Sequence, residues 1–454
     1  MKFSIHIILF LSLILPGFAI GQTLQNLTLP DAIQFALENK PGLKTFELES
    51  QIAASKTEVL KLKRQPQVSA AVDVQLNPVL QTSVIPVGAF NPALGSDATA
   101  TVRFGTLWQN AAGITVSQTL YDPSIAAQIR EQEFQQQLIA ADQEKTAKTI
   151  AVEVAGAYYA VLIAGEELAF AEADSARAQQ FYDETRKRQA GGKLLQNEVN
   201  TAALSLNAAR LTLERARLNR QQLLKNLCFR MGVDPKRAAE IAFSGNLASL
   251  LKQIEGQNRA SFDAAALEQN RPELRQLFLD SELQNLKIEV EKQRTAPTLS
   301  ATAYAGANNL SDDAPFFAEN SWFGNVFVGL KLNVPISAYW QQQKYFPQYR
   351  LKQQQNVLEA AALKAQYEND FENAQLNHAL ALRTMEVRVR DLELTRQNVQ
   401  LIRDRFNEGV ALPSAVLSAE TTVQQTQYNY LRSAYDLLLA DLELRRTLGS
   451  LTFK

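Results

Sequence analysis

The sequence predicts a mainly α-helical fold with a β-barrel portion, built from a unit of helix, two strands, long helix and short helix that occurs twice. Three observations predict it: landmark residues repeat, two helical segments are abnormally long, and strand candidates come in two matching pairs. Pro41 and Pro66 recur 231 residues later as Pro272 and Pro297. A repeat on this scale indicates one duplicated architecture, whose function depends on how similar halves close on one another.

The expected organisation starts with a leader that is removed. Residues 1–21 combine a basic start at Lys2, an apolar stretch and a small-residue cleavage site, which predicts a signal peptide and export. Residues 22–259 form the first expected repeat and residues 260–454 the second. The chain holds 46 basic and 47 acidic residues, and this balance gives no indication of a nucleic-acid partner.

The two long helical segments, at residues 124–190 and 338–408, contain very few glycines or prolines. At 1.5 Å per residue each extends roughly 100 Å. Shorter helices are expected at residues 30–64, 194–231, 262–294 and 413–448. Apolar residues recur every seven positions at Val416, Val423, Tyr430, Leu437 and Leu444, and at Leu204, Leu211 and Leu218, with Leu206 and Leu213 beside them. A seven-residue repeat predicts coiled-coil packing, and two neighbouring stripes predict a helix on each side.

Strands are expected at about residues 67–76, 111–121, 298–307 and 324–335. From Val68 to Leu76 apolar side chains alternate with polar ones, which predicts a strand with one apolar face. Trp108 and Trp322 stand beside strand ends, as the aromatic girdles of membrane barrels do. Small soluble hairpins with ordinary core aromatics remain the alternative.

A membrane span is expected to consist of these strands. After the leader, the longest uninterrupted apolar run, Val154 to Gly165, is shorter than the roughly 20 residues of a spanning helix. Four strands cannot close into a barrel, and an open edge in lipid leaves backbone groups unsatisfied. Several chains must therefore share one barrel. Two copies give eight strands with a filled interior, whereas three give twelve strands with a lumen.

Short motifs follow one another in a specific order: Leu29-Pro30-Asp31-Ala32, Val116-Ser117-Gln118-Thr119-Leu120-Tyr121-Asp122, Arg405-Phe406-Asn407-Glu408-Gly409 and Tyr428-Asn429-Tyr430-Leu431. By their order, spacing and duplication, the sequence from about Leu29 to Leu451 resembles the TolC-like outer membrane efflux proteins. The resemblance implies a homotrimeric channel-tunnel in the cell outer membrane of a Gram-negative bacterium. Each chain would supply four strands to a shared 12-stranded transmembrane β-barrel, which a long α-helical barrel continues across the periplasm.

The resemblance also implies a function and partners. The channel would passively conduct drugs, metabolites or proteins in a tripartite efflux or type I secretion system. Its partners would be a periplasmic adaptor (membrane fusion protein), an inner-membrane transporter and outer membrane lipid, with no nucleic acid. The alternative is a periplasmic coiled-coil adaptor or scaffold protein without a transmembrane barrel.

Glycine-containing turns are predicted where each long helix ends. The residues of these two turns are Arg188, Gly191, Gly192, Leu195, Arg405, Gly409, Leu412 and Pro413. We expect positive φ angles at the glycines, because the chain must reverse there, and a new helix starting at Pro413. The simpler interpretation is a plain helical hairpin. The resemblance implies in addition that both tips contact the adaptor and form the iris at the periplasmic end.

The resemblance implies a ring of aspartates at the narrow end of the tunnel. This sequence lacks those aspartates, because the matching positions hold Ala415 and Ser418. The candidate constriction residues are therefore Ser418 itself, Glu198 after the first turn and Glu420 after the second. Glutamates repeated three times around an axis would attract cations. A solvated glutamate on a helix face is the simpler interpretation of both.

No catalytic residue, metal or cofactor is expected. His378 is the one histidine after the leader, so a zinc-binding histidine pair is not available. Cys228 is the one cysteine, and we expect it buried in a helix. Because no nucleotide-binding motif is visible, the energy for transport is expected to come from the partner transporter.

Overall fold

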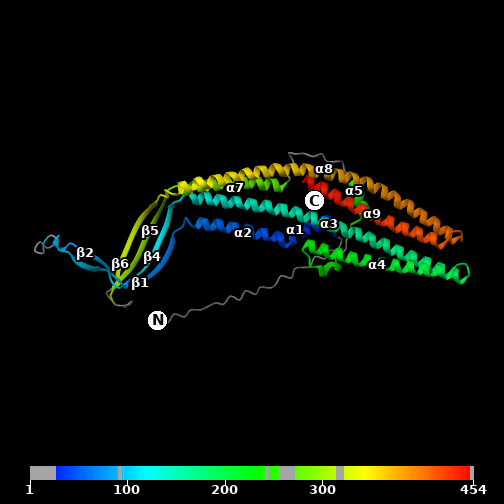
Figure 1. Ribbon diagram of the computed structural model, residues 1–454, viewed down its shortest axis with the longest axis horizontal. Helices are drawn as coiled ribbons and strands as arrows, with labels where there is room; N and C mark the ends of the chain where they lie inside the picture. The colour runs from blue at the N-terminus through cyan, green and yellow to red at the C-terminus, as the bar shows by residue number, and fades with distance from the viewer. Residues whose placement is uncertain are drawn as a thin grey trace, which may run out of the picture. The chain divides into compact units, whose positions relative to one another are not determined.

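The computed structural model describes residues 27–89, 95, 97–240, 245–255, 271–312 and 322–449. The predicted signal peptide at residues 1–21 lies outside these residues. The described chain is mostly helical, and its strands form a four-stranded sheet and a separate hairpin (Figure 1). The predicted fold class is confirmed, with the barrel open in the single copy.

The two longest helices are α3, Pro123–Ala190, with 68 residues, and α8, Ala338–Asn407, with 70 residues. Each is followed by a helix of 36 residues, α4 (Gln196–Met231) or α9 (Pro413–Leu448). The other described helices are α1 (Leu29–Asn39), α2 (Pro41–Leu62), α5 (Leu247–Glu255) and α7 (Pro272–Arg294), with short 3-10 turns at Val87–Ala89 and Pro235–Glu240. The long segments therefore form continuous helices, as their scarcity of glycine and proline predicts.

The single helix predicted at residues 30–64 is wrong, because the structure has two helices there. Lys40 is extended, with φ −68° and ψ 122°, and it precedes Pro41. A proline ring disfavours the helical conformation of the preceding residue, so α1 ends and α2 starts at this point. At the start of α1, the Asp31 N–H donates to Thr28 Oγ1 (3.4 Å) and the Thr28 N–H donates to Asp31 Oδ2 (3.2 Å). This capping box satisfies two backbone donors.

The sheet has the strand order β1-β4-β5-β6, and every neighbouring pair is antiparallel. Its strands are β1 (Gln67–Leu76), β4 (Trp108–Tyr121), β5 (Thr298–Ser311) and β6 (Trp322–Asn333). Each overlaps an expected strand. A further hairpin, β2 (Gln81–Ile85) with β3 (Ala100–Phe104), lies between β1 and β4 and was not predicted. Its strands have five residues each, too few for a clear alternation among nearby prolines and glycines.

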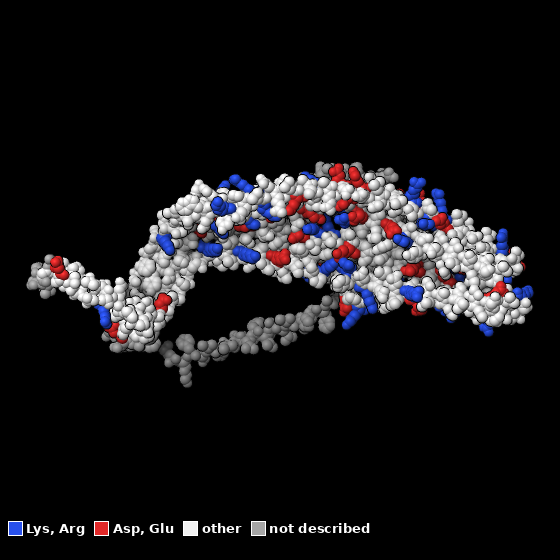
Figure 2. Space-filling view, viewed as in Figure 1, with Lys and Arg blue, Asp and Glu red and all other residues white. Residues whose placement is uncertain are grey.

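The two faces of the sheet differ in polarity. One face carries exposed aliphatic side chains, with Val72 71%, Val328 81% and Leu330 72% exposed. The opposite face carries mainly polar and small residues: Gln67, Ser69, Asp73 and Gln75 in β1, Thr115 and Ser117 in β4, Thr302 and Asn308 in β5, and Asn325 and Lys331 in β6. Figure 2 shows few charged side chains over the strands and many over the helices. The apolar face suits lipid and the polar face suits water.

Contacts divide the chain into two units. Unit 1 comprises Met1–Pro41, Ala147–Phe262 and Phe371–Lys454, and unit 2 comprises Gly42–Thr146 and Asp263–Asp370. In unit 1, α4 contacts α1 and α9. The side chains of Leu227, Met231 and Leu437 are fully buried there, as is Cys228 in α4, which confirms the predicted buried cysteine. Burial raises the pKa of the Cys228 thiol. The proposed division into two sequence repeats stays a prediction.

The two apolar stripes predicted on α4 differ in burial. Leu206 is buried, whereas Leu204, Leu211 and Leu218 are 68%, 52% and 55% exposed. The α9 residues Val416, Val423 and Leu437 are buried. One stripe of α4 thus packs within the single copy, while the other is open.

Among the described residues, α3 alone contains a stretch long and apolar enough to cross a membrane, and 44% of that stretch is buried within the chain. This stretch was not predicted, because the expectation for membrane helices rested on uninterrupted apolar runs. A core helix in a packed structure has the same composition, so the stretch is weak evidence for a helical span.

Candidate functional sites at the helical turns and sheet edges

The first turn joins α3 to α4 in unit 1. The Lys193 N–H donates to the Arg188 carbonyl (2.9 Å) and the Gly192 N–H donates to the Gln189 carbonyl (2.9 Å). Gly192 has φ +70°, which confirms the predicted left-handed conformation. For Gly191 the expectation of positive φ is wrong, because the helix needs one left-handed residue to end in this motif.

The second turn, between α8 and α9, has the same hydrogen-bond pattern. The Val410 N–H donates to the Arg405 carbonyl (2.8 Å) and the Gly409 N–H donates to the Phe406 carbonyl (2.9 Å). Gly409 has φ +80°, as predicted. Pro413 starts α9 at a position where its missing N–H costs no hydrogen bond, which confirms that expectation.

Exposed leucines stand at both turns. Leu195 precedes α4 and is 70% exposed, and Leu412 precedes α9 and is 67% exposed. Val410 adds a third apolar side chain, 74% exposed. Both leucines have extended backbones, with ψ of 157° and 151°. The duplicated turns therefore present a matched apolar surface, defined here as the tip surface of Leu195, Val410 and Leu412.

Arg188 connects the two turns. Its guanidinium donates to the carbonyl oxygens of Phe406 and Asn407 (3.0 Å to the latter), and it lies 4.2 Å from the centroid of the Phe406 ring. It also donates to Glu184 Oε1 at 2.8 Å. A cation at these carbonyls complements the negative end of the α8 dipole. The hydrogen bonds of the Arg188 guanidinium are thus made to groups of the same chain, whereas the Arg405 side chain is exposed.

An aromatic cluster supports this link. The rings of Phe181 and Phe406 are 5.3 Å apart, and both belong to a buried cluster with Ala202 and Val416. The cluster draws one residue from each of α3, α8, α4 and α9. Phe406 was not predicted as a site residue, although it lies inside the motif Arg405-Phe406-Asn407-Glu408-Gly409.

The candidate constriction residues have different surroundings. The Glu198 carboxylate accepts from the Leu195 N–H at 2.8 Å, so it caps α4. Ser418 is exposed on α9. Glu420 has a side chain 15% exposed and is paired with Arg177 (3.3 Å) and Arg403 (2.6 Å).

The Glu420 pairs extend into a polar network between α3, α8 and α9. Arg177 also pairs with Asp174, and Gln427 Nε2 lies 3.5 Å from Asp174 Oδ1. Burial raises the pKa of Asp174, while Arg177 and Gln427 act in the opposite direction. Such a network fixes the packing of three helices because each charge depends on the others.

In unit 2, the sheet ends at β1 on one side and β6 on the other. All ten residues of β1 are exposed, and so are nearly all of β6. Unpaired strand edges present free backbone donors and acceptors to a further strand. Both edges are therefore open in the single copy.

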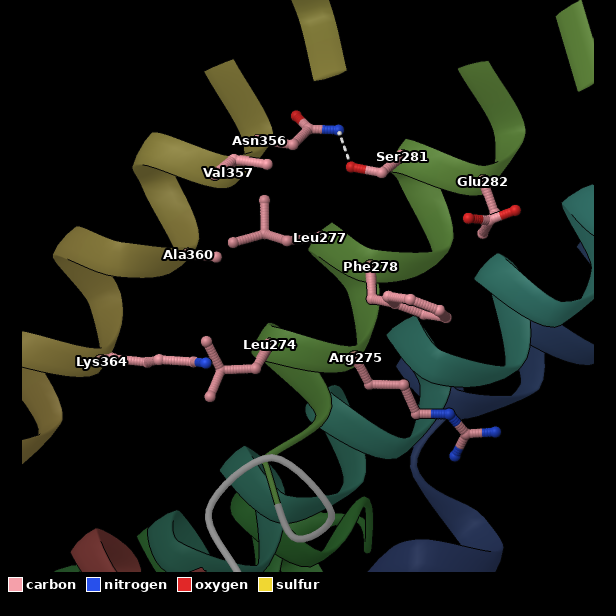
Figure 3. A pocket seen from close by; sticks show the side chains of 10 residues that line it. All are labelled: Leu274, Arg275, Leu277, Phe278, Ser281, Glu282, Asn356, Val357, Ala360 and Lys364. Atoms are coloured by element: carbon pink, nitrogen blue, oxygen red, sulfur yellow. Dashed lines mark hydrogen bonds between the residues drawn. The ribbon is translucent and has the colours of Figure 1, made fainter. Parts of the chain in front are cut away.

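A groove of about 420 Å³ lies between α7 and α8 in unit 2 (Figure 3). Figure 3 shows Leu274 and Leu277 of α7 directed toward α8, and Phe278 directed away from it. The Asn356 side chain donates to Ser281 Oγ (3.4 Å) and to Asp280 Oδ2 (2.6 Å). Half of the ten lining residues are apolar and half are polar or charged. Elsewhere in the described residues, no group of three His, Cys, Asp or Glu side chains could hold a metal ion.

Comparisons with known proteins agree with this architecture. A model of the outer membrane efflux protein family matches residues 32–233. No curated protein matches the sequence. The fold is similar to that of CusC, with a TM-score of 0.67 and 18% identity over 93% of this chain and 92% of that one. It is also similar to VceC of Vibrio cholerae, with a TM-score of 0.65 and 15% identity over 93% and 96% of the two chains.

MtrE of Neisseria gonorrhoeae, an outer membrane channel in its open state, gives a TM-score of 0.67 and 14% identity over 94% of this chain and 90% of its own. At these identities the structures show the fold, and the family model adds the kind of protein. The open sheet with one apolar face and the two long helices agree with the similar structures and with the family model. Residues 32–233 of this chain thus match the outer membrane efflux protein family, and the fold of the chain is that of the TolC-like outer membrane channels.

Proposed function

We propose that three copies of this chain close one twelve-stranded barrel and form a passive export duct. The observation that carries the proposal is the four-stranded sheet with two open edges and an exposed apolar face. In lipid, an open edge leaves backbone groups unsatisfied at several kcal/mol each, so the sheet needs further strands. Three copies supply twelve strands and leave a lumen, whereas two copies would give a filled barrel.

The open leucine stripe of α4 supports the same assembly. Leu204, Leu211 and Leu218 recur every seven residues and are more than half exposed in the single copy. A helix of a neighbouring copy would cover them by coiled-coil packing. Helices that have a neighbour on each side form the wall of a tube, which suits a duct through the periplasm.

The tip surface of Leu195, Val410 and Leu412 is the proposed contact for a periplasmic adaptor. These side chains are at least two-thirds exposed and stand on turns fixed by Gly192 and Gly409. Exposed apolar residues on a rigid support are suited to bind a partner protein. Arg405 and Pro413 flank this surface, while Arg188 holds the two turns together. An inner-membrane transporter would supply the energy.

Glu198 and Ser418 remain the proposed constriction residues of the duct. Ser418 is exposed and Glu198 is partly exposed, so both can face a water-filled space. Glu420 is flanked by two arginines, and this pairing supports an anchoring role better than that of a free charge. We propose no catalytic residue and no cofactor, because transport through a duct requires neither.

Purification in detergent tests the proposal. Light scattering of the mature chain, corrected for bound detergent, is expected to give the mass of three copies. A second measurement deletes residues 299–334, which contain most of β5 and β6, and is expected to abolish the trimer. A monomer that is stable in buffer without detergent would instead favour the scaffold alternative.

A further inference from the structure

The sheet carries only two charges. Within its four described strands, Asp73 in β1 is the one acidic residue and Lys331 in β6 is the one basic residue. Both are exposed, and within the described part of the chain neither has a hydrogen-bonding or ion-pair partner. The two opposite charges thus stand on the two edge strands, and the inner strands β4 and β5 have none.

Both charges lie on the same face of the sheet. The register aligns Ala71 of β1, Gly113 of β4, Gly306 of β5 and Asn325 of β6 in one row. Asp73 is two residues from Ala71, and Lys331 is six residues from Asn325. Even separations along a strand keep side chains on one face, so both point to the polar side. In the proposed barrel this side is the lumen.

The chain direction allows β6 of one copy to pair with β1 of the next. Four antiparallel strands place β1 and β6 in opposite directions. A second copy beside the first therefore brings its β1 antiparallel to β6, as in all other pairs of this sheet. The same pairing repeated around the ring closes the barrel without a change of pattern.

Barrel geometry sets the stagger of this pairing. Strands about 4.8 Å apart that tilt by about 45° advance roughly 6 residues along the chain for every four strands. Within one copy, Ala71 of β1 and Asn325 of β6 lie in the same row. At the seam, an advance of six residues along β6 means that Ala71 of the neighbouring copy faces Lys331 and not Asn325. Leu76 then faces Val326 and Ser69 faces Asn333, so most of β1 is paired. The opposite stagger would leave only two residues of β1 opposite β6.

We propose that Asp73 of one copy and Lys331 of the neighbouring copy form an ion pair at each seam of the shared barrel, and that this pair excludes registers of the seam that hold the two charges apart. The inference rests on the proposed function, because it needs the shared barrel. In the staggered register Asp73 faces Gly329, so Lys331 is its diagonal neighbour, within reach of a long side chain. A slip of one residue would turn the apolar face of the strand into the lumen. A slip of two residues in one direction sets Asp73 directly opposite Lys331, whereas a slip of two in the other direction leaves the charges four positions apart, so the pair excludes registers on that side.

The contribution of the pair is specificity. An ion pair in contact with water adds little to stability. If one of the two charges were reversed, however, like charges would stand side by side at all three seams and would oppose assembly. The sheet offers no other charge to select between registers that differ by an even number of residues.

Cysteine cross-linking tests the register with both charges intact. In a Cys228→Ser background, Val72→Cys combined with Leu330→Cys places the thiols opposite one another in the staggered register. Val72→Cys combined with Gly324→Cys does so in the unstaggered register. We expect oxidation to give a covalent trimer on a denaturing, non-reducing gel for the first pair and monomers for the second. The reverse result would overturn the proposed register.

Charge reversal tests the ion pair. Asp73→Lys and Lys331→Asp are each expected to lower the fraction of trimer that survives detergent at least several-fold, and the double variant is expected to restore it. Gln75→Lys, on the same face and strand, is the matched control and should leave the trimer intact. A double variant no better than either single variant overturns the ion pair, even where the wild-type chain is trimeric. A monomeric wild-type chain refutes the shared barrel itself, which separates the two failures.

Discussion

The guanidinium of Arg188, at the end of α3, donates to the carbonyl oxygen of Phe406, at the end of α8, and lies over the Phe406 ring. The two residues are 218 positions apart and belong to the two duplicated turns. A cation that both satisfies the last carbonyls of a helix and covers an aromatic ring holds that helix end in place. The two turns are therefore one structural element, and we expect them to move together.

The first prediction concerns this link. Arg188→Ala should destabilise the paired turns by about 1.5–3 kcal/mol, since a charged donor to two carbonyls at the end of α8 is lost. Arg188→Lys should recover only part of this, because an ammonium cannot reproduce the forked geometry of a guanidinium. Limited proteolysis at the turns and the midpoint of thermal unfolding measure the effect. Arg186→Ala, an exposed arginine in the same turn of α3, is the control. Equal protease sensitivity of the Arg188 and Arg186 variants would show that the link does not hold the turns.

The second prediction concerns the left-handed glycines. Gly409 has φ +80° and no atom near the position of an added Cβ, so a side chain there is opposed by backbone strain and not by a clash. Gly409→Val should cost about 1–2 kcal/mol or more, distort the second turn and lower drug resistance in cells.

Gly191→Ala provides the matched control for this change. Gly191 has no positive φ, and an added Cβ would meet the Arg188 carbonyl oxygen at an ordinary 3.6 Å. We expect normal resistance at a normal protein level for that variant. Unchanged resistance for Gly409→Val, with the trimer present at the wild-type level, would argue against a role of the second turn in the open duct.

Local signals made part of the structure predictable. The absence of helix breakers identified α3 and α8, and period-two alternation identified the barrel strands, because both patterns depend on residues close in sequence. Gly192 and Gly409 were predictable for the same reason, since the end of a helix commonly needs a left-handed residue. The expectation for Gly191 failed because a single such residue is sufficient.

The surroundings of the site residues were not predictable. Arg188 was expected to face a partner, but the carbonyl groups it binds come from a helix more than 200 residues away. Glu420 looks like a solvated glutamate in the sequence, and its two arginine partners come from α3 and α8. Such contacts depend on the tertiary packing of helices, which the sequence of one helix does not contain.

The third prediction is a pH dependence. Burial raises the pKa of Asp174 above its ordinary value of 3.8, so the folded chain holds this proton more tightly than the unfolded chain does. The stabilisation from this group is fully present below the unfolded pKa and is lost as the pH rises through the higher folded pKa. Asp174→Asn lacks this titration. The Tm of the variant should therefore rise relative to the wild-type Tm across that window and then stay level.

Asp183→Asn, an exposed position on the same helix, is the comparison for the pH series. Its Tm should follow the wild-type value at every pH. A Tm difference between Asp174→Asn and wild type that does not change with pH would mean that Asp174 does not titrate with folding.

The fourth prediction uses the packing of Tyr304 over two glycines of the sheet. A Cβ added to Gly113 would lie 2.5 Å from the Tyr304 ring and meet nothing else as closely. A Cβ added to Gly306 would meet the Tyr304 hydroxyl and, at 2.6 Å, the backbone oxygen of Ala112. A side chain can rotate away, but the backbone of a paired strand cannot.

Gly113→Ala should therefore weaken the detergent-resistant trimer, and adding Tyr304→Ser should restore it. Gly306→Ala should weaken the trimer as well, but Tyr304→Ser should not restore it, because the contact with the Ala112 oxygen persists. The trimer fraction on unheated gels, measured for the four variants and for Tyr304→Ser alone, checks this difference. Rescue of Gly306→Ala by Tyr304→Ser would mean that the strands β4 and β5 can separate at this row, contrary to the register described above.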